Sequence, residues 1–232
     1  MFGGGVDGAW YDPSDLSTLF KDVAGATPVT AAGDAVARVN DKSGNGHNLL
    51  QSSAGLRPIY RTSGGLSWLE FDGVDDTMST STIFLTLQVP SYIAACFSKG
   101  AENALSVFAV FKDASNYHRV INQSTSSRMT AAIRSTARSL ATITSAGSSF
   151  PISTIKVADT LAVAGGNDIA INNGTPVTVA NSWVATDTVA GCSITVGPAQ
   201  LNFYGGIVSL SDASSKRSDV CKYLGALGGI AI

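Results

Sequence analysis

An acidic stretch, residues 66–78 (LSWLEFDGVDDTM), carries the densest set of side chains with chemical potential. Asp72, Asp75 and Asp76 place three carboxylates within five positions, and Asp41 could supply a fourth. Calcium takes six to eight oxygen ligands, several of them from Asp side chains and turn carbonyls. A calcium site is therefore one interpretation of this stretch, and no other cofactor is expected.

The same aspartates also suit a tight turn between two strands. Short acidic side chains accept hydrogen bonds from nearby backbone amides, and Asp72 and Asp75 are placed to do so. Asp76 would then pair with Arg57 or Arg61. This turn interpretation is favoured over calcium, because the full calcium-loop pattern is missing.

Aromatic residues form the second set with binding potential, since sugars need exposed aromatic platforms and planar polar side chains. We expect core packing for most of them, because aromatic side chains bury large areas. Trp183 differs, because it lies between Asn181 and a polar Thr-Asp-Thr stretch, which predicts a loop position and makes it the candidate ligand-binding residue. The possible platforms are Trp10, Trp68, Tyr117, Trp183 and Tyr204.

Catalytic patterns are weak, and we expect no enzyme. A retaining glycosidase needs two carboxyl groups about 5–5.5 Å apart, whereas the two glutamates, Glu70 and Glu102, stand far apart in the sequence. The two histidines, His47 and His118, lie in a polar turn and in a strand-like segment, with no nucleophile motif beside them.

Composition excludes several partners. Only 14% of the residues are charged and the net charge is -2, without the clustered Lys and Arg that nucleic acid requires. The first twenty residues do not resemble a signal peptide, and no apolar run reaches the ~18 residues of a membrane helix. Cys96, Cys192 and Cys221 are widely spaced, which predicts free thiols in a reducing cytoplasm.

The elements that must position these residues are strands. Twenty-four glycines, and 17 acidic residues of which two are Glu, favour many turns. Residues 105–111 are apolar almost throughout, which predicts a central strand. The acidic stretch predicts a hairpin with Trp68 and Glu70 on one face and Leu69 and Phe71 on the other.

Two later features complete the expected elements. The sequence Asn-Asn-Gly at 172–174 predicts a hairpin turn, because Asn-Gly accepts left-handed backbone angles. Apolar residues at helical spacing predict a C-terminal helix within 211–227, capped by Ser214 or Ser215 and ended by Gly228. We expect a flexible glycine-rich arm over residues 1–8 and one antiparallel two-sheet sandwich over residues 9–232.

Five ordered motifs resemble a known family. Together they are similar to the concanavalin A-like, laminin-G-like jelly-roll domain of tailed-bacteriophage structural proteins. The resemblance implies one concave and one convex antiparallel sheet, and it covers nearly the whole chain. The motifs are WYDPSDLSTLF at 10–20, DKSGNG at 41–46, RPIY at 57–60, LEFDGVDD at 69–76 and FYGGIV at 203–208.

The resemblance implies two functions from different classes. The first is a non-enzymatic virion structural protein, a head decoration or tail surface component assembled in the host cytoplasm. Its partners would be capsid or tail subunits and further copies of itself. The alternative is a glycan-binding adhesion module that recognises host-surface carbohydrate on its concave sheet. A fold hosts many functions, so the fold alone does not choose between them. The low charge, the free cysteines, the many small and hydroxyl side chains and the glycine-rich arm fit the virion protein, which is the main prediction.

Overall fold

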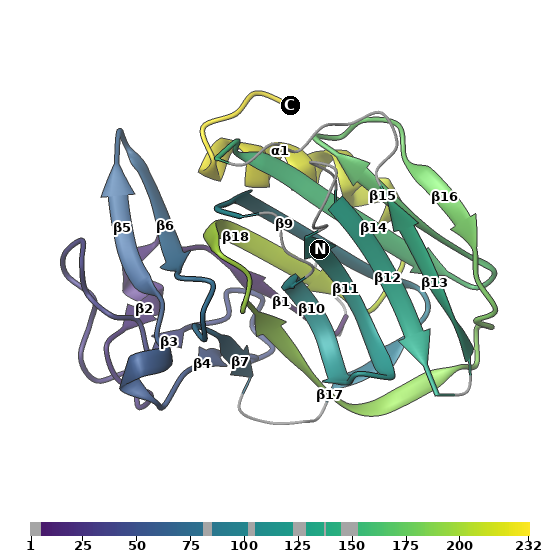
Figure 1. The fold of residues 1–232 in the computed structure, drawn as a ribbon, viewed down its shortest axis with the longest axis horizontal. Coiled ribbons are helices and arrows are strands. Elements are labelled where there is room, and N and C mark those ends of the chain that lie inside the picture. Colours follow the sequence, from purple (N-terminus) through teal and green to yellow (C-terminus); the bar gives the residue numbers. More distant parts are fainter. Residues whose placement is uncertain (1–5, 81–84, 102–104, 123–128, 137, 145–152) are drawn as a thin grey trace.

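The structure, a computed structural model, describes residues 6–80, 85–101, 105–122, 129–136, 138–144 and 153–232, and in them two antiparallel sheets pack face to face (Figure 1). Sheet A has eight strands in the order β16-β15-β14-β9-β18-β6-β5, and β1 also pairs with β18. These strands are β1 (Gly8–Tyr11), β5 (Ile59–Ser63), β6 (Leu66–Phe71), β9 (Ser91–Lys99), β14 (Lys156–Val163), β15 (Gly166–Ile171), β16 (Val177–Ala180) and β18 (Leu201–Ser209).

Sheet B has ten strands in the order β13-β12-β11-β10-β17-β7-β4-β3-β2, and β8 also pairs with β17. The described residues thus confirm the predicted all-β sandwich. The strands are β2 (Leu19–Phe20), β3 (Arg38–Val39), β4 (Leu49–Leu50), β7 (Met78–Thr80), β8 (Leu85–Gln88), β10 (Ser106–Asp113), β11 (Asn116–Asn122), β12 (Met129–Ser135), β13 (Arg138–Thr144) and β17 (Thr188–Val196).

The main core lies between the sheets and follows the strand alternation. In β6, Leu69 and Phe71 are buried in it, whereas Trp68 and Glu70 lie on the outer face, as the sequence predicts. Phe108 of sheet B stands 5.7 Å from Phe203 of sheet A between ring centroids. Burial of such rings supplies much of the driving force for closing the two sheets.

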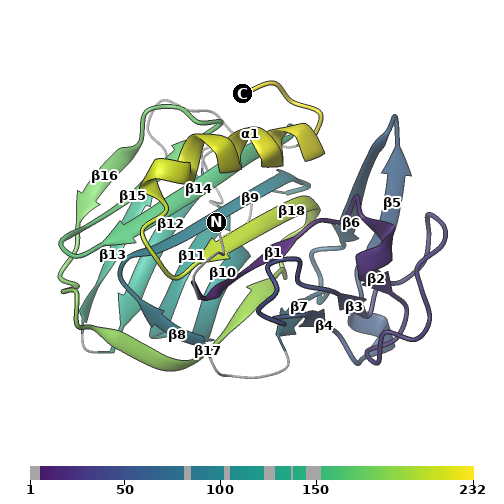
Figure 2. The ribbon, with the colours of Figure 1, turned by 180° about the vertical axis from the view of Figure 1, so that it is seen from behind.

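Helix α1 (Arg217–Leu227) covers part of the outer face of sheet A (Figure 2). Its buried residues Val220, Cys221 and Leu224 join a second apolar cluster with Tyr92 and Val157 of sheet A. The helix ends at Gly228 as predicted, but the capping prediction is wrong. Ser214 begins a separate 3-10 turn, η3 (Ser214–Lys216), and Lys216 stands at the N-cap.

A buried ion cluster fixes the start of this helix to the sheet. Arg217 donates from Nη1 and Nη2 to the two carboxylate oxygens of Asp168 at 2.7 and 2.9 Å. Its Nε pairs with Asp159, which is completely buried. Burial raises the pKa of Asp159 to about 6, and the positive charge of Arg217 opposes that rise.

The acidic stretch corrects one prediction. Strand β6 belongs to sheet A and β7 to sheet B, so they do not form the predicted hairpin with each other. The turn at residues 72–77 instead carries the chain from one sheet to the other. The turn residues specify only that the chain reverses direction. A hairpin within one sheet and a connection between the two sheets both meet that requirement.

Three smaller predictions concern the turn at residues 172–174, the cysteines and the N-terminal arm. Asn172 and Asn173 adopt positive φ between β15 and β16, which confirms the predicted hairpin turn. All three cysteines are free and buried. Strand β1 begins at Gly8, and Asp7 accepts a hydrogen bond from Leu210, so this end of the expected arm is docked. Residues 1–5 lie outside the described residues. Across the described ranges, helices with the length and apolarity of a membrane span are absent.

Two further 3-10 turns, η1 (Leu16–Thr18) and η2 (Ala54–Leu56), lie in the loops that precede β2 and β5. The side chain of Asp15 accepts from the backbone N–H of Ser17 and caps η1, where the sequence predicts a short helical turn. These loops pack around the end of the sandwich that carries β5 and β6 (Figure 1).

Candidate functional site

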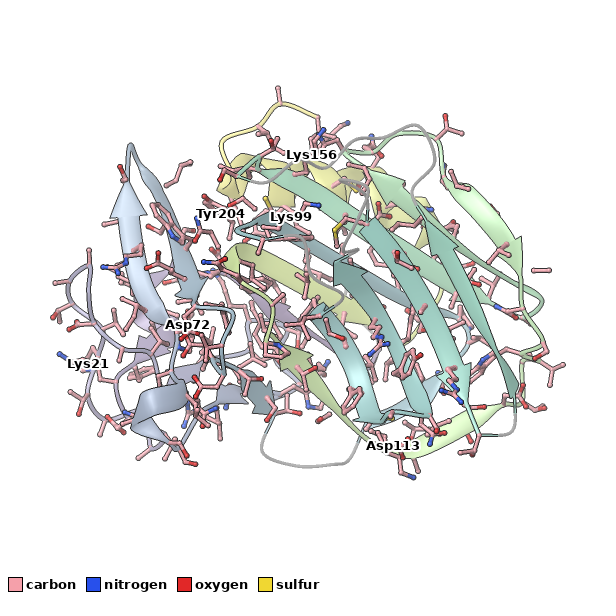
Figure 3. All side chains as sticks on the ribbon, in the orientation of Figure 1. Lys21, Asp72, Lys99, Asp113, Lys156 and Tyr204 are labelled. Carbon is pink, nitrogen blue, oxygen red and sulfur yellow. The ribbon has the colours of Figure 1, made fainter. Side chains whose placement is uncertain are left out.

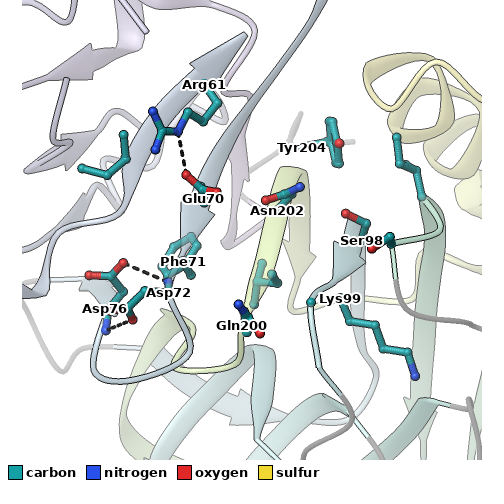
Figure 4. Close-up of a pocket in the computed structure, with 15 residues that line it drawn as sticks. Arg61, Glu70, Phe71, Asp72, Asp76, Ser98, Lys99, Gln200, Asn202 and Tyr204 are labelled. Atoms are coloured by element: carbon teal, nitrogen blue, oxygen red, sulfur yellow. Dashed lines mark hydrogen bonds and ion pairs between the residues drawn. The ribbon is translucent and has the colours of Figure 1, made fainter. Parts of the chain in front are cut away.

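A pocket of about 670 Å³ opens on the part of the outer face of sheet A that lies beyond helix α1 (Figure 4). We call it the sheet A pocket. Its volume falls in the range of small-molecule sites, about 300–1,000 Å³. Four strands, β5, β6, β18 and β9, contribute to it. The lining residues are Ile59, Arg61, Glu70, Phe71, Asp72, Asp76, Ser98, Lys99, Gly100, Ser153, Ile155, Gln200, Leu201, Asn202 and Tyr204.

Three polar side chains form a row across the floor. Asn202 of β18 pairs directly with Glu70 of β6 on one side and with Ser98 of β9 on the other. Their strand neighbours, such as Leu201 and Phe203, point into the core, so alternation turns this row outward. Directly opposed residues in a sheet lie about 4.5–5.5 Å apart between Cβ atoms. A hydroxyl, an amide and a carboxylate thus stand side by side.

The Tyr204 ring borders this row and is itself largely buried, with 4% of its surface exposed. Tyr204 lies 5.7 Å from Trp68 between ring centroids, with the ring planes tilted by 40°. Burial raises the pKa of Tyr204, while contacts with the side chains of Ser98 and Asn202 oppose that rise. Asp72, Lys99 and Tyr204, which line the pocket, are labelled in Figure 3.

An ion pair forms the rim on the side of β5. Nε of Arg61 stands 2.6 Å from a carboxylate oxygen of Glu70, and both side chains are 44% exposed. The two planar groups therefore remain accessible from the pocket. The predicted pairing of Arg61 or Arg57 with Asp76 is wrong, because Arg57 donates instead to backbone carbonyls such as that of Gln51.

The acidic turn borders the pocket on the same side. Asp72 Oδ1 accepts from the backbone N–H groups of Val74, Asp75 and Asp76 at 2.8, 3.3 and 3.4 Å. Those hydrogen bonds lower the pKa of Asp72. Asp76 accepts from the N–H of Asp72, yet burial and the neighbouring carboxylates raise its pKa to about 6. Asp72 caps the turn as predicted.

The three aspartates do come together. Carboxylate oxygens of Asp72, Asp75 and Asp76 lie within 4.8 Å of one another. This gives three of the oxygens that calcium would need. Asp41 does not join them, because its carboxylate binds the backbone of Trp10 and His47. Calcium binding at this turn stays a prediction.

The split pKa values of Asp72 and Asp76 have the form of an acid–base pair. Both carboxylates are, however, engaged with backbone amides of the turn. His118 is buried between the sheets against Ser91 and Thr160, and burial lowers its pKa to about 3. Glu102 lies outside the described residues. In the described part of the chain, Asp72, Asp76 and His118 are thus all engaged in hydrogen bonds within the fold.

The predicted sugar platforms are distributed differently. Trp183 is 1% exposed and packs in the main core, which covers its ring faces and removes the predicted loop platform. The ring of Trp10 packs edge-on against Tyr223. Of the five predicted platforms, Tyr204 lines the pocket, and Trp68 packs against Tyr204 without lining it.

Sequence reasoning missed Ser98, Asn202 and Gln200. Ser98 lies far from Gln200 and Asn202 along the chain, and the pairing of β9 with β18 brings them together. The signal for Asn202 is present, because it is a polar residue between Leu201 and Phe203 in an apolar strand. Strand alternation alone would have placed it on the outer face.

No family model matches the chain, and a search of curated proteins finds no match either. Solved structures share the fold. Domain 4 of AbnA, a GH43 extracellular arabinanase from Geobacillus stearothermophilus, solved with arabinotriose, has a TM-score of 0.56 at 12% identity, with 88% of this chain and 92% of that domain covered.

Toxin binding domains share it as well. The binding domain of Paraclostridial Mosquitocidal Protein 1 has a TM-score of 0.61 at 6% identity, covering 80% of this chain and 49% of that one. The botulinum neurotoxin serotype G binding domain has a TM-score of 0.60 at 11% identity, covering 81% and 49%. The chain thus spans about half the length of these toxin domains. At such identities the likeness shows the sandwich fold alone.

Proposed function

We propose that the protein is a non-enzymatic glycan-binding module whose ligand occupies the sheet A pocket. The observation that carries the proposal is the row of Ser98, Asn202 and Glu70 across the floor of the pocket, which the largely buried Tyr204 ring borders on one side. Saccharides present hydroxyl groups that both donate and accept, and a hydroxyl, an amide and a carboxylate match them.

The solved structures support this choice of ligand class. The arabinanase domain was solved with arabinotriose, and a botulinum neurotoxin type C structure is described by its interaction with two ganglioside molecules. Two further structures with this fold, those of the mosquitocidal protein and of serotype G, are binding domains. Together these structures support the glycan-binding alternative better than the virion function that the sequence motifs favour.

The charge of the pocket restricts the kind of saccharide that can bind. Three carboxylates line it, those of Glu70, Asp72 and Asp76, against two cations: Arg61, which is paired with Glu70, and Lys99, which is buried. Carboxylates accept hydrogen bonds from neutral hydroxyls and repel other anions. We therefore expect neutral saccharides here, and arabinotriose is a suitable first probe.

Binding is tested by a glycan array followed by titration calorimetry with the best neutral ligand. Asn202→Ala removes the central amide and should weaken binding at least about tenfold, equal to about 1.4 kcal/mol. Glu70→Gln should also weaken it. The matched control is Asp219→Asn, which removes one exposed carboxylate on α1. Unchanged affinity in Asn202→Ala would exclude the pocket as the site.

The virion function remains a prediction from the sequence motifs. It predicts a symmetric assembly that binds capsid or tail subunits without sugar, since closed oligomers need matched surfaces. The mass of the purified protein in solution tests it. A stable closed oligomer would support a virion component, and a monomer that binds a neutral glycan would support the adhesion module alone.

Calcium at the acidic turn is tested independently of sugar. A cation that binds only the folded protein must raise its melting temperature. If Asp72, Asp75 and Asp76 hold calcium, then calcium should raise the melting temperature of the wild type and leave that of Asp75→Asn nearly unchanged. Equal curves with calcium and with chelator would exclude the site.

A further inference from the structure

A second polar surface lies on the outer face of sheet B, on the opposite side of the sandwich from the sheet A pocket. Strands β10, β11 and β12 place Phe111, Tyr117 and Arg134 in one row across the sheet. The next row contains Arg119 between two alanines. We call the four larger residues, Phe111, Tyr117, Arg119 and Arg134, the arginine face.

Strand alternation fixes which way these side chains point. His118 lies between Tyr117 and Arg119, and it reaches across the interior to Ser91 and Thr160 of sheet A. Its two neighbours must therefore point outward. Phe111, Arg119 and Arg134 are all partly exposed.

Arg119 is held in place but has few acceptors. Its guanidinium carbon lies 4.0 Å from the centroid of the Tyr117 ring, in the stacked arrangement typical of cation–π pairs. Nη1 donates to Ser106 Oγ at 3.3 Å, and Nε is buried with no hydrogen-bond acceptor. An arginine carries five N–H donors. Most of this donor capacity is therefore not used within the described protein.

Arg134 adds a second positive charge one row away. Its Nη1 donates to the backbone carbonyl of Ala114 at 3.1 Å. In the described residues neither Arg134 nor Arg119 forms a salt bridge with a carboxylate. The acid of the adjoining turn, Asp113, accepts instead from Ser115 and Asn116 of that turn, and it lies well apart from the pocket residue Asp72 in Figure 3.

We propose that the arginine face binds the carboxylate of an acidic saccharide. A stacked guanidinium offers a rigid fork that matches a carboxylate with two parallel hydrogen bonds. The partly exposed ring of Phe111 stands beside this fork and can pack against a sugar ring. This site is separate from the sheet A pocket and does not depend on the function proposed for it.

The position of the arginine face favours a saccharide over an acidic peptide. Extended peptides bind sheets by adding a strand to an exposed edge. Strand β11 pairs with β10 on one side and β12 on the other, so its backbone groups already belong to the ladder. A ligand can therefore be recognised there only by side chains. A sugar ring that bears a carboxylate suits them, because the ring can pack on Phe111 while the carboxylate accepts hydrogen bonds from the guanidinium of Arg119.

The test is titration calorimetry with three acidic trisaccharides, carrying galacturonate, glucuronate or sialate, and with a neutral trisaccharide. At least one acidic ligand should bind and should weaken at higher ionic strength. Its affinity should fall at least about tenfold in Arg119→Gln and in Arg134→Gln. Arg119→Lys keeps the charge but loses the fork and should not restore full affinity.

Controls separate this site from simple charge and from the pocket. Lys112→Gln removes an exposed positive charge beside Phe111 and should change affinity less than twofold. Asn202→Ala should leave acidic-saccharide binding intact, and Arg119→Gln should leave neutral-glycan binding intact. If Arg119→Gln does not fold, Arg134→Gln carries the test. Binding of none of the three ligands, unchanged affinity in folded arginine variants, or equal binding of tetraglutamate would overturn the proposal.

Discussion

The outer face of sheet A has a covered half and an open half, and strands β9 and β18 run beneath both. Where helix α1 lies over the sheet, the outward residues are apolar, such as Cys96 of β9 and Ile207 of β18. Beyond the helix, the same two strands present Ser98 and Asn202. Of these four positions, the two apolar ones lie beneath the helix and the two polar ones lie beyond it, so we assign stability to one half of the face and the proposed binding to the other.

The ion pairs of the two halves differ in the same way. Under the helix, Arg217 joins Asp159, which is fully buried. In the open half, Arg61 and Glu70 are both 44% exposed. A buried charge needs its partner, whereas an exposed pair contributes little to stability. The comparison therefore predicts large stability effects in the covered half and small ones at the pocket.

The largest effect is expected for Arg217→Ala. It leaves Asp159 buried without its positive partner, which should cost about 3–5 kcal/mol of unfolding free energy. Urea unfolding measures this loss. Lys222→Ala, an exposed change on the same helix, should stay within about 0.5 kcal/mol. A loss below 1 kcal/mol for Arg217→Ala would mean that the covered half does not depend on this cluster.

A smaller, pH-dependent effect is expected for Asp76→Asn at the pocket edge. Because the pKa of Asp76 is raised to about 6, the folded state holds a proton that the unfolded state releases above about pH 4. Asp76 therefore favours folding at low pH, and its contribution falls as pH rises from about 4 to 6.

As the pH rises from 4 to 6.5, the unfolding free energy of Asp76→Asn should increase relative to that of the wild type by on the order of 1–2 kcal/mol. Urea unfolding across this pH range measures the difference. Asp75→Asn is the control in the same turn, and it should change the profile only slightly because Asp75 affects Asp76 through its charge alone. A constant difference between Asp76→Asn and wild type would show that Asp76 does not titrate in this window.

The smallest stability effect is expected for Arg61→Gln. Exposed ion pairs contribute about 0.2–1 kcal/mol to stability and are screened by salt. The free energy of unfolding measured in urea should therefore fall by no more than about 1 kcal/mol. A loss above about 2 kcal/mol would show that the pocket rim is structural. The boundary between the two halves would then not follow helix coverage.

The sequence predicts those parts of the fold that depend on local pattern. Strand alternation places Leu69 and Phe71 in the core and Glu70 outside, because the two-residue period acts over a few neighbouring positions. Asn173-Gly174 marks the turn between β15 and β16, because its backbone freedom is also a local property. The hairpin predicted across the acidic turn is wrong because the partner of each strand is set by long-range packing. Turn residues do not specify that packing.

The candidate site was harder to predict for the same reason. Trp183 has polar neighbours along the chain, but Asn181 binds its backbone N–H while the indole enters the core. The polar neighbours thus correctly indicate a loop in the backbone, but they do not indicate that the Trp183 side chain is buried. Asn202 and Ser98 become a site only after β9 pairs with β18, a contact that a single sequence does not reveal.

The most direct test of the central claim is a backbone amide NMR titration of the full chain with the highest-affinity neutral glycan from the array. If the open half of sheet A binds sugar, the largest shift changes should occur at Ser98, Glu70 and Asn202. Amides beneath α1 should change little. Shift changes confined to sheet B, or to the helix-covered half, would contradict the assignment of binding to the open half.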